Sequence, residues 1–117
     1  MPDKTPVHVF SYGTLRHAKV QRELYGREVR TTPDSLPGYR LSEVTITDPK
    51  VLRVSGTDSH PIALPGEPSD HVDGAVLSLT PRELAATDEY EVADYVRREV
   101  RLSSGITAWL YAAADPV

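Results

Sequence analysis

The residues Tyr12-Gly13-Thr14-Leu15 follow the apolar run 7–10 and precede a segment with helical spacing. A strand, a glycine turn and a helix start in this order can form an anion site, because the first N–H groups of a helix have no partner within it and carry partial positive charge. Glycine lets a ligand approach the backbone, and the threonine hydroxyl can cap the helix or bind the ligand. The same pattern is also typical of an ordinary strand-to-helix turn.

A second candidate group lies near the end of a predicted helix that begins at Pro81. Asp88 and Glu91 follow Leu84 at i+4 and i+7, so both carboxylates share the helix face that Leu84 buries. Burial would raise the pKa of such a carboxyl group toward the range useful for acid–base chemistry, and a nearby arginine would lower it. The alternative is a structural role, in which Asp88 or Glu91 caps a loop or pairs with Arg97.

Tyr95 and Arg97 lie two residues apart in a segment that alternates like a strand. This spacing places them on one face, and Val96, Val100 and Leu102 on the other, half-buried face. A phenol and a guanidinium beside an inward carboxylate could order it or line a polar pocket. The alternative is a surface tyrosine and a solvated arginine.

The elements that must position these residues are short strands separated by turn-rich stretches. In the first half, the chain predicts a buried strand at 7–10, a short helix at 16–25, a loop at 31–38, an extended stretch at 38–46, a strand at 51–54 and a short edge segment at 60–64. The loop at 31–38 is predicted from its two prolines, and Pro61 indicates the edge position of the last segment.

In the second half, residues 75–79 predict a strand, and Thr80-Pro81-Arg82-Glu83 predicts a helix start with a threonine N-cap and a capping box. The segment 96–102, the turn Ser104-Gly105 and the segment 106–113 predict a hairpin. Five or six strands and two or so short helices result. We expect an α+β fold built on a small mixed, mostly antiparallel β-barrel, closed or half-closed, in a single domain over residues 1–117.

Composition excludes several classes of function. The 117 residues carry a net charge of −4 with scattered basic residues, which argues against a nucleic-acid surface. There is no cysteine, the four histidines show no metal-ligand spacing, and no Gly-x-Ser-x-Gly, Walker or dinucleotide fingerprint is present. The N-terminus lacks the apolar core of a signal peptide and no segment is long enough to span a membrane, so we expect a cytoplasmic protein without metal or membrane attachment.

Five stretches, in order along nearly the whole chain, resemble the gamma-glutamylcyclotransferase-like superfamily, closest in pattern to its small bacterial and gamma-glutamylamine cyclotransferase members. They are Tyr12-Gly13-Thr14-Leu15 after its strand, Leu36-Pro37-Gly38-Tyr39, His60-Pro61-Ile62 in a slot that is usually aromatic-Pro-aliphatic, Val72-Asp73-Gly74-Ala75-Val76, and Asp88-Glu89-Tyr90-Glu91 with Tyr95-Val96-Arg97. Two departures bear on specificity: Val92 stands where the family often has glycine, and Arg16-His17-Ala18 replaces its usual Lys/Arg-x-Gly.

The resemblance implies a compact barrel with a pocket at its mouth. It implies that Tyr12 to Leu15 hold the carboxylate of a small-molecule γ-glutamyl substrate, and that Glu91 is the catalytic acid/base. Tyr95 and Arg97 match the family's Tyr-x-Arg pair, and Tyr111 matches a late strand tyrosine near the pocket.

The implied reaction is attack of the α-amine of a γ-glutamyl group on its own γ-carbonyl, which releases 5-oxoproline and an amine or amino acid. One carboxylate can move both protons, so no cofactor is required. The alternative is a non-catalytic pocket protein that binds a small carboxylate metabolite. A protein-interaction module has little support beyond the Pro-rich stretch at 59–68.

Overall fold

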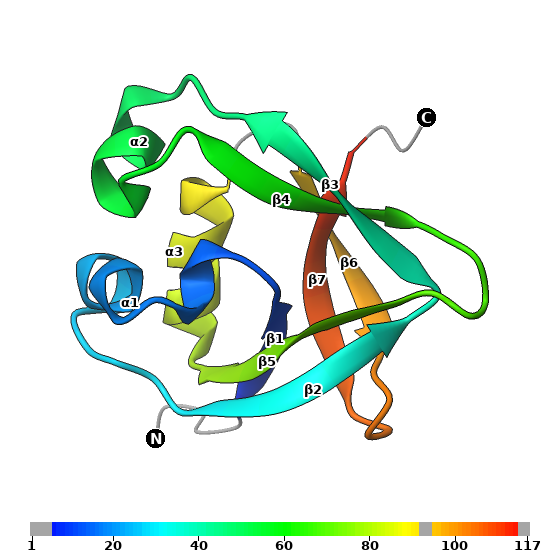
Figure 1. The fold of residues 1–117 in the computed structure, drawn as a ribbon. Coiled ribbons are helices and arrows are strands. Elements are labelled where there is room, and N and C mark those ends of the chain that lie inside the picture. The colour runs from blue at the N-terminus through cyan, green and yellow to red at the C-terminus, as the bar shows by residue number, and fades with distance from the viewer. Residues whose placement is uncertain (1–5, 92–94, 115–117) are drawn as a thin grey trace.

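A computed structural model describes residues 6–91 and 95–114. Within these ranges seven strands and three α-helices form one mixed α+β unit (Figure 1). The elements are β1 (Val7–Ser11), the 3-10 turn η1 (Thr14–Arg16), α1 (Ala18–Tyr25), β2 (Thr31–Pro37), β3 (Tyr39–Thr45), α2 (Pro49–Ser55), β4 (Ser59–Pro65), β5 (His71–Leu79), α3 (Pro81–Tyr90), β6 (Tyr95–Arg101) and β7 (Thr107–Ala113).

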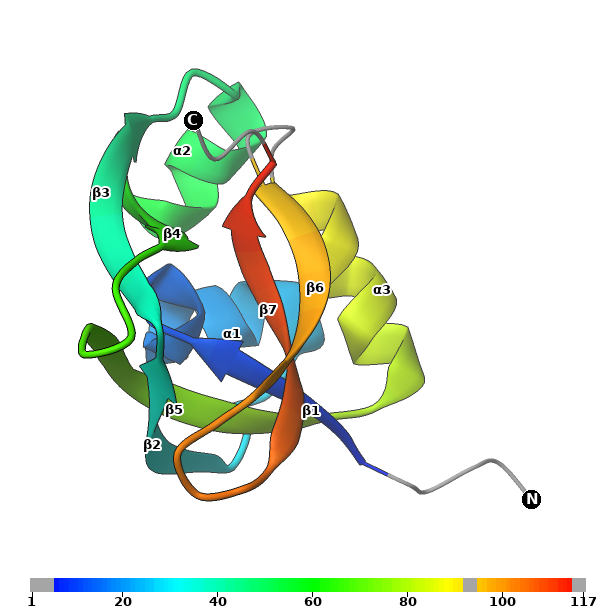
Figure 2. The ribbon, with the colours of Figure 1, turned by 90° about the vertical axis from the view of Figure 1, so that its right-hand side faces the viewer.

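The strands form a single curled sheet in the order β2-β5-β1-β7-β4-β3, and β6 pairs with β7 outside this path. Most pairs are antiparallel, whereas β7 runs parallel to both β1 and β4. The sheet curls into a half-barrel, and the helices gather at its open side (Figures 1 and 2). The expected mixed, mostly antiparallel and half-closed barrel is confirmed.

Strand β1 is buried on both faces, which explains its continuous apolar run. Val9 packs in the cluster that contains Val20 of α1 and Tyr90 of α3, and Phe10 packs in a second cluster formed largely by the sheet. Both side chains are almost fully buried. Because β1 is packed on both faces, its end holds the first residue of the following loop in a fixed position.

Helix α3 begins as its sequence predicts. The Thr80 side chain accepts a hydrogen bond from the N–H of Glu83, the Glu83 side chain accepts one from the N–H of Thr80, and Pro81 occupies the first turn. The helix ends at Tyr90, and the N–H of Glu91 still donates to the carbonyl of Thr87. Glu91 therefore lies at the C-terminal end of the helix, where the chain turns away from the helix axis.

The predicted loop at 31–38 is wrong, because residues 31–37 form strand β2. This strand pairs with β5 alone and lies at one end of the sheet. Proline has no backbone N–H group to donate. An edge strand tolerates this because it has no partner strand on its outer side. Pro33 and Pro37 are therefore compatible with an extended edge, and their presence did not require a loop.

The predicted strand at 51–54 is also wrong, because these residues lie in helix α2. The Asp48 side chain accepts a hydrogen bond from the N–H of Lys50, Pro49 starts the helix, and Gly56 ends it in the left-handed conformation with φ 77°. A short apolar run fits a helix and a strand equally well, and the capping residues decide between them.

Two further expectations need correction. The segment 60–64 lies in β4, which pairs with β3 on one side and with β7 on the other, so it is not an edge. Val96 is 37% exposed, so it does not belong to a buried face of β6, although Leu102 is buried. The described residues contain three α-helices, in line with the expected two or so, and none of these is long and apolar enough to cross a membrane.

Candidate active site

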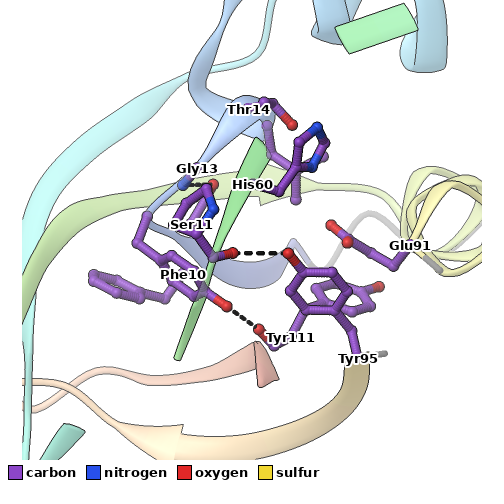
Figure 3. Close-up of a pocket in the computed structure, with 11 residues that line it drawn as sticks. Phe10, Ser11, Gly13, Thr14, His60, Glu91, Tyr95 and Tyr111 are labelled. Carbon is purple, nitrogen blue, oxygen red and sulfur yellow. Dashed lines mark hydrogen bonds between the residues drawn. The ribbon is translucent and has the colours of Figure 1, made fainter. Parts of the chain in front are cut away.

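A small pocket lies where the ends of β1, α3 and β7 meet the starts of β4 and β6 (Figure 3). Its cavity volume is about 30 Å³. The lining residues are Phe10, Ser11, Tyr12, Gly13, Thr14, Leu15, His60, Pro61, Glu91, Tyr95 and Tyr111. Seven of the eight predicted site residues are among them, and only Arg97 is not.

The loop Tyr12-Gly13-Thr14-Leu15 leads into the 3-10 turn η1 and not directly into an α-helix. The expected helix start at the loop is thus a 3-10 helix, and the α-helix α1 begins only at Ala18. The N–H groups of Thr14 and Leu15 nevertheless have no hydrogen-bond partner among the residues that the structure describes. These two donors, from residues that line the pocket, can bind an anion without a helix dipole.

Gly13 is needed for close packing. A Cβ at this position would lie 3.2 Å from Cγ of Pro61, which is tighter than an ordinary van der Waals contact. Its backbone N–H donates to the hydroxyl of Ser11 at 3.3 Å. The absence of a side chain thus lets β4 approach the loop and form one wall of the pocket.

The phenol of Tyr12 ties the loop to two strands of the sheet. Its hydroxyl donates to the carbonyl of Tyr111 in β7 and accepts from the N–H of Ala63 in β4 at 3.0 Å. Burial raises the pKa of Tyr12 above its usual range, and the backbone hydrogen bond from Ala63 works in the opposite direction. This side chain fixes the pocket wall, because its hydroxyl is already bonded on both sides.

The hydroxyl of Thr14 is bonded to the last residue of α3. Its Oγ1 lies 2.8 Å from the hydroxyl oxygen of Tyr90, the residue that precedes Glu91. This contact fixes the distance between the loop and the end of the helix. The hydroxyl of Thr14 therefore holds the wall, and its backbone N–H has no partner among the described residues.

The carboxyl group of Glu91 points from the end of α3 into the pocket (Figure 3). Among the described residues, none donates a hydrogen bond to this carboxyl group. Burial raises the pKa of Glu91 to about 8, and the negative charge of Asp88 adds to the rise. The result is a carboxyl group that can exchange a proton near neutral pH.

Asp88 has a different environment from Glu91, although both follow Leu84 on one helix face. The hydroxyl of Tyr111 donates to Oδ1 of Asp88 at 2.5 Å, and Nε of Arg97 lies 3.1 Å from the same oxygen. Asp88 is half-exposed and does not line the pocket. The predicted structural pairing with Arg97 thus applies to Asp88 and not to Glu91.

Arg97 lies outside the pocket lining. Its guanidinium carbon is 4.4 Å from the ring centroid of Trp109, and its Nε pairs with Asp88. Arg97 therefore contacts Asp88 and Trp109 and does not reach the pocket lining. Tyr95, which is two residues away on β6, does line the pocket, and its hydroxyl donates to the carbonyl of Pro61 at 2.7 Å.

Sequence reasoning did not select Phe10, Ser11, His60 and Pro61 as site residues, although all four line the pocket. The last two lie in a stretch that carries the family resemblance, but no local signal places β4 beside the loop. That placement comes from the parallel pairing of β4 with β7, which joins Ala63 to Ala112. In the described part of the chain, no group of three or more His, Asp or Glu side chains could hold a metal ion.

Comparisons with solved structures identify the fold. A protein from Arabidopsis thaliana matches with a TM-score of 0.72 and 23% identity over 99% of this chain and 68% of its own. A structure named gamma-glutamyl cyclotransferase matches with a TM-score of 0.74 and 17% identity, over 94% of this chain and 68% of its own. An uncharacterised protein from Pyrococcus horikoshii matches with a TM-score of 0.62 and 22% identity, over 95% and 81%.

A search of the curated proteins finds no match. The family model described as "Gamma-glutamyl cyclotransferase, AIG2-like" matches residues 9–117, which include every residue of the pocket. The chain therefore belongs to the AIG2-like gamma-glutamyl cyclotransferase family.

Proposed function

We propose that the protein is a γ-glutamyl cyclotransferase that needs no cofactor and acts in the cytoplasm on a small-molecule substrate. The α-amine of a γ-glutamyl group attacks the γ-carbonyl carbon of the same group. A five-membered lactam, 5-oxoproline, forms as the bond between that carbon and the leaving nitrogen breaks. The attacking nitrogen loses a proton and the leaving nitrogen gains one.

The observation that carries this proposal is the inward carboxyl group of Glu91, with a pKa of about 8. An α-amino group titrates at about 8 in model compounds. Matched pKa values make proton transfer from the substrate ammonium to Glu91 nearly free of thermodynamic cost. The protonated Glu91 then returns the proton to the leaving nitrogen, so one residue completes the cycle.

The N–H groups of Thr14 and Leu15 are suited to the negatively charged part of the substrate. Both are donors from residues that line the pocket, and neither has a partner within the described residues. They would hold the α-carboxylate or the oxyanion that develops on the γ-carbonyl oxygen. Holding the chain in its cyclising rotamer can contribute up to roughly 7–11 kcal/mol in favourable cases.

The size of the pocket bears on how substrate enters. A cavity volume of about 30 Å³ holds about two water molecules, which is less than a γ-glutamyl group occupies. We expect the wall formed by Pro61 and Tyr95 to move outward on binding, so that a γ-glutamyl group fits between this wall and Glu91. The leaving group then remains at the mouth, in solvent.

A second candidate, a pocket that binds a small carboxylate metabolite without reaction, is favoured by the same pKa. At pH 7 a carboxyl group with a pKa of about 8 is mostly protonated, and it can then donate a hydrogen bond to a bound carboxylate. Together with the free N–H groups of the loop, this donor would suffice for binding alone.

The two candidates are separated by incubating the purified protein with a γ-glutamyl amine, a γ-glutamyl dipeptide and glutathione, and measuring 5-oxoproline by chromatography. Product from any of these substrates supports the enzyme. Thermal stabilisation by these compounds without product supports the binding protein. If neither 5-oxoproline nor thermal stabilisation were observed, both candidates would be contradicted.

A further inference from the structure

His60 is a buried polar side chain of the pocket that the proposed reaction does not use. It lies in β4 next to Pro61 and is only 5% exposed. Its ring forms part of the pocket wall (Figure 3). A buried imidazole in such a position needs an explanation, because an apolar side chain would fill the same wall without a desolvation cost.

One nitrogen of the ring is fixed by the loop that follows α2. Nε2 lies 3.2 Å from the carbonyl oxygen of Thr57 and 3.1 Å from Oγ of Ser55. A carbonyl oxygen only accepts hydrogen bonds, so Nε2 must carry the hydrogen. Burial lowers the pKa of His60, which keeps the ring neutral near pH 7. In a neutral ring with hydrogen on Nε2, Nδ1 carries a lone pair and can only accept.

This second nitrogen faces accessible space. Nδ1 has no hydrogen bond to any residue that the structure describes. Within the same described residues, no fully enclosed side-chain nitrogen or oxygen lacks a partner. Nδ1 is therefore not fully enclosed, and His60 is one of the residues that line the pocket. The ring thus presents an unused acceptor to whatever the pocket binds.

We propose that Nδ1 of His60 accepts a hydrogen bond from an N–H group of the γ-glutamyl substrate, an inference that rests on the proposed function. The other polar groups of the pocket have different tasks, since the N–H groups of Thr14 and Leu15 are donors and Glu91 exchanges protons. A neutral acceptor is the complement of an N–H group. The substrate has two N–H groups that could be this partner, that of the α-amine and that of the amide whose bond is broken.

Two substitutions separate substrate binding from a structural role of the ring. His60→Gln keeps a donor near the position of Nε2, so it retains the bond to Thr57, but it has no acceptor near Nδ1. His60→Asn places an oxygen near the position of Nδ1 and loses the bond to Thr57. We expect kcat/KM to fall roughly tenfold in His60→Gln and less in His60→Asn, and the loss of thermal stability to follow the opposite order.

Two substrates with different leaving groups distinguish the α-amine from the amide as the N–H group that Nδ1 binds. γ-Glutamyl methylamide has an amide N–H, and the γ-methyl ester of glutamate does not, while both keep the α-amine. If Nδ1 binds the amide, His60→Gln lowers turnover of the methylamide and leaves that of the ester unchanged. If Nδ1 binds the α-amine, both substrates lose the same factor.

Each remaining outcome is decisive. Wild-type protein that forms 5-oxoproline, together with a His60→Gln variant as active as wild type on both compounds, would overturn the role of His60 alone. A larger loss of activity in His60→Asn than in His60→Gln would assign the ring to structure and overturn it as well. Wild-type protein that forms no 5-oxoproline from either compound would overturn the proposed function, and the role of His60 with it.

Discussion

The hydroxyl oxygen of Tyr90 lies 2.8 Å from the hydroxyl oxygen of Thr14. This contact joins the end of α3, from which Glu91 projects, to the loop that offers free N–H groups to the pocket. The proposed proton carrier, Glu91, and the proposed anion site are thus linked by one buried hydrogen bond. Since the two elements lie far apart in the sequence, the bond also holds distant parts of the chain together beside the pocket.

Tyr90→Phe removes this bond without changing the packing of the ring. We expect the free energy of unfolding to fall by about 1 kcal/mol and kcat/KM to fall by about tenfold, because the loop and Glu91 lose their common anchor. Tyr25→Phe is the matched control. It removes a hydroxyl pair with Thr87, at 2.6 Å, that joins α1 to α3 away from the pocket. Denaturation curves and steady-state kinetics should show similar stability losses but an activity loss in Tyr90→Phe alone.

The dependence of kcat/KM on pH follows from the pKa of Glu91, which burial and Asp88 raise to about 8. The reacting complex holds one proton between Glu91 and the substrate amine. Activity should therefore fall at low pH, where both groups are protonated, and at high pH, where neither is. We expect a bell-shaped profile with its maximum near pH 8, at the mean of the pKa values of Glu91 and the α-amine.

Asp88→Asn should move the acidic limb of that profile to lower pH. It removes the negative charge that helps to raise the pKa of Glu91, and it leaves Arg97 without its acidic partner. Glu89→Gln is the matched control, because it also removes one negative charge from α3 but at an exposed position. Among the described residues, Asp88 is the sole charged neighbour that shifts the pKa of Glu91. An acidic limb that moved equally in Asp88→Asn and Glu89→Gln would contradict the assignment of this limb to Glu91.

Gly13→Ala should reduce activity more than stability. The added methyl group would lie 3.2 Å from Cγ of Pro61 and would push that ring out of its place in the pocket wall. We expect kcat/KM to fall by at least roughly tenfold, since a misplaced wall misaligns the substrate. Gly26→Ala is the control, because Gly26 has a φ of 71° and no side chain nearby. Alanine there should cost about 1 kcal/mol of stability and leave activity unchanged.

The stability of the wild-type protein should depend on pH through Glu91. Its pKa rises from 4.5 to about 8 on folding, so the folded state favours the protonated form. The associated stability is fully present below pH 4.5 and is lost as the pH rises through 8. Glu91→Gln cannot ionise and should be more stable than wild type at pH 9 by roughly 1–4 kcal/mol, but not at pH 5. Urea denaturation at both pH values measures the difference.

Several residues of the pocket were predictable as candidates from local patterns. The glycine turn after β1, the capping box before α3 and the i, i+4, i+7 spacing of Leu84, Asp88 and Glu91 are each complete within a few residues. Such signals need no knowledge of distant contacts. They were sufficient to select five of the pocket residues, Tyr12 to Leu15 and Glu91, whereas Tyr95 followed from strand alternation and Tyr111 from the family resemblance.

Apart from the pairing with Arg97, which stood as an alternative for Asp88 or Glu91, the partners of those residues could not be predicted, because strands distant in the sequence supply them. Tyr111 and Arg97 reach Asp88 from β7 and β6, which leaves Glu91 as the carboxyl group that faces the pocket. His60 comes close only because β4 lies beside β7. The errors at β2 and α2 have a local cause, since prolines suit an edge strand and short apolar runs do not distinguish helix from strand.

The most direct test compares 5-oxoproline formation by wild-type protein and Glu91→Gln at saturating γ-glutamyl substrate. Glutamine keeps the shape of the side chain but cannot carry the proton from the attacking to the leaving nitrogen. We expect kcat to fall by at least roughly 10²–10⁴-fold, while the melting temperature at pH 7 does not decrease. Turnover close to that of wild type in a folded Glu91→Gln variant would contradict the role of Glu91 and the proposed reaction with it.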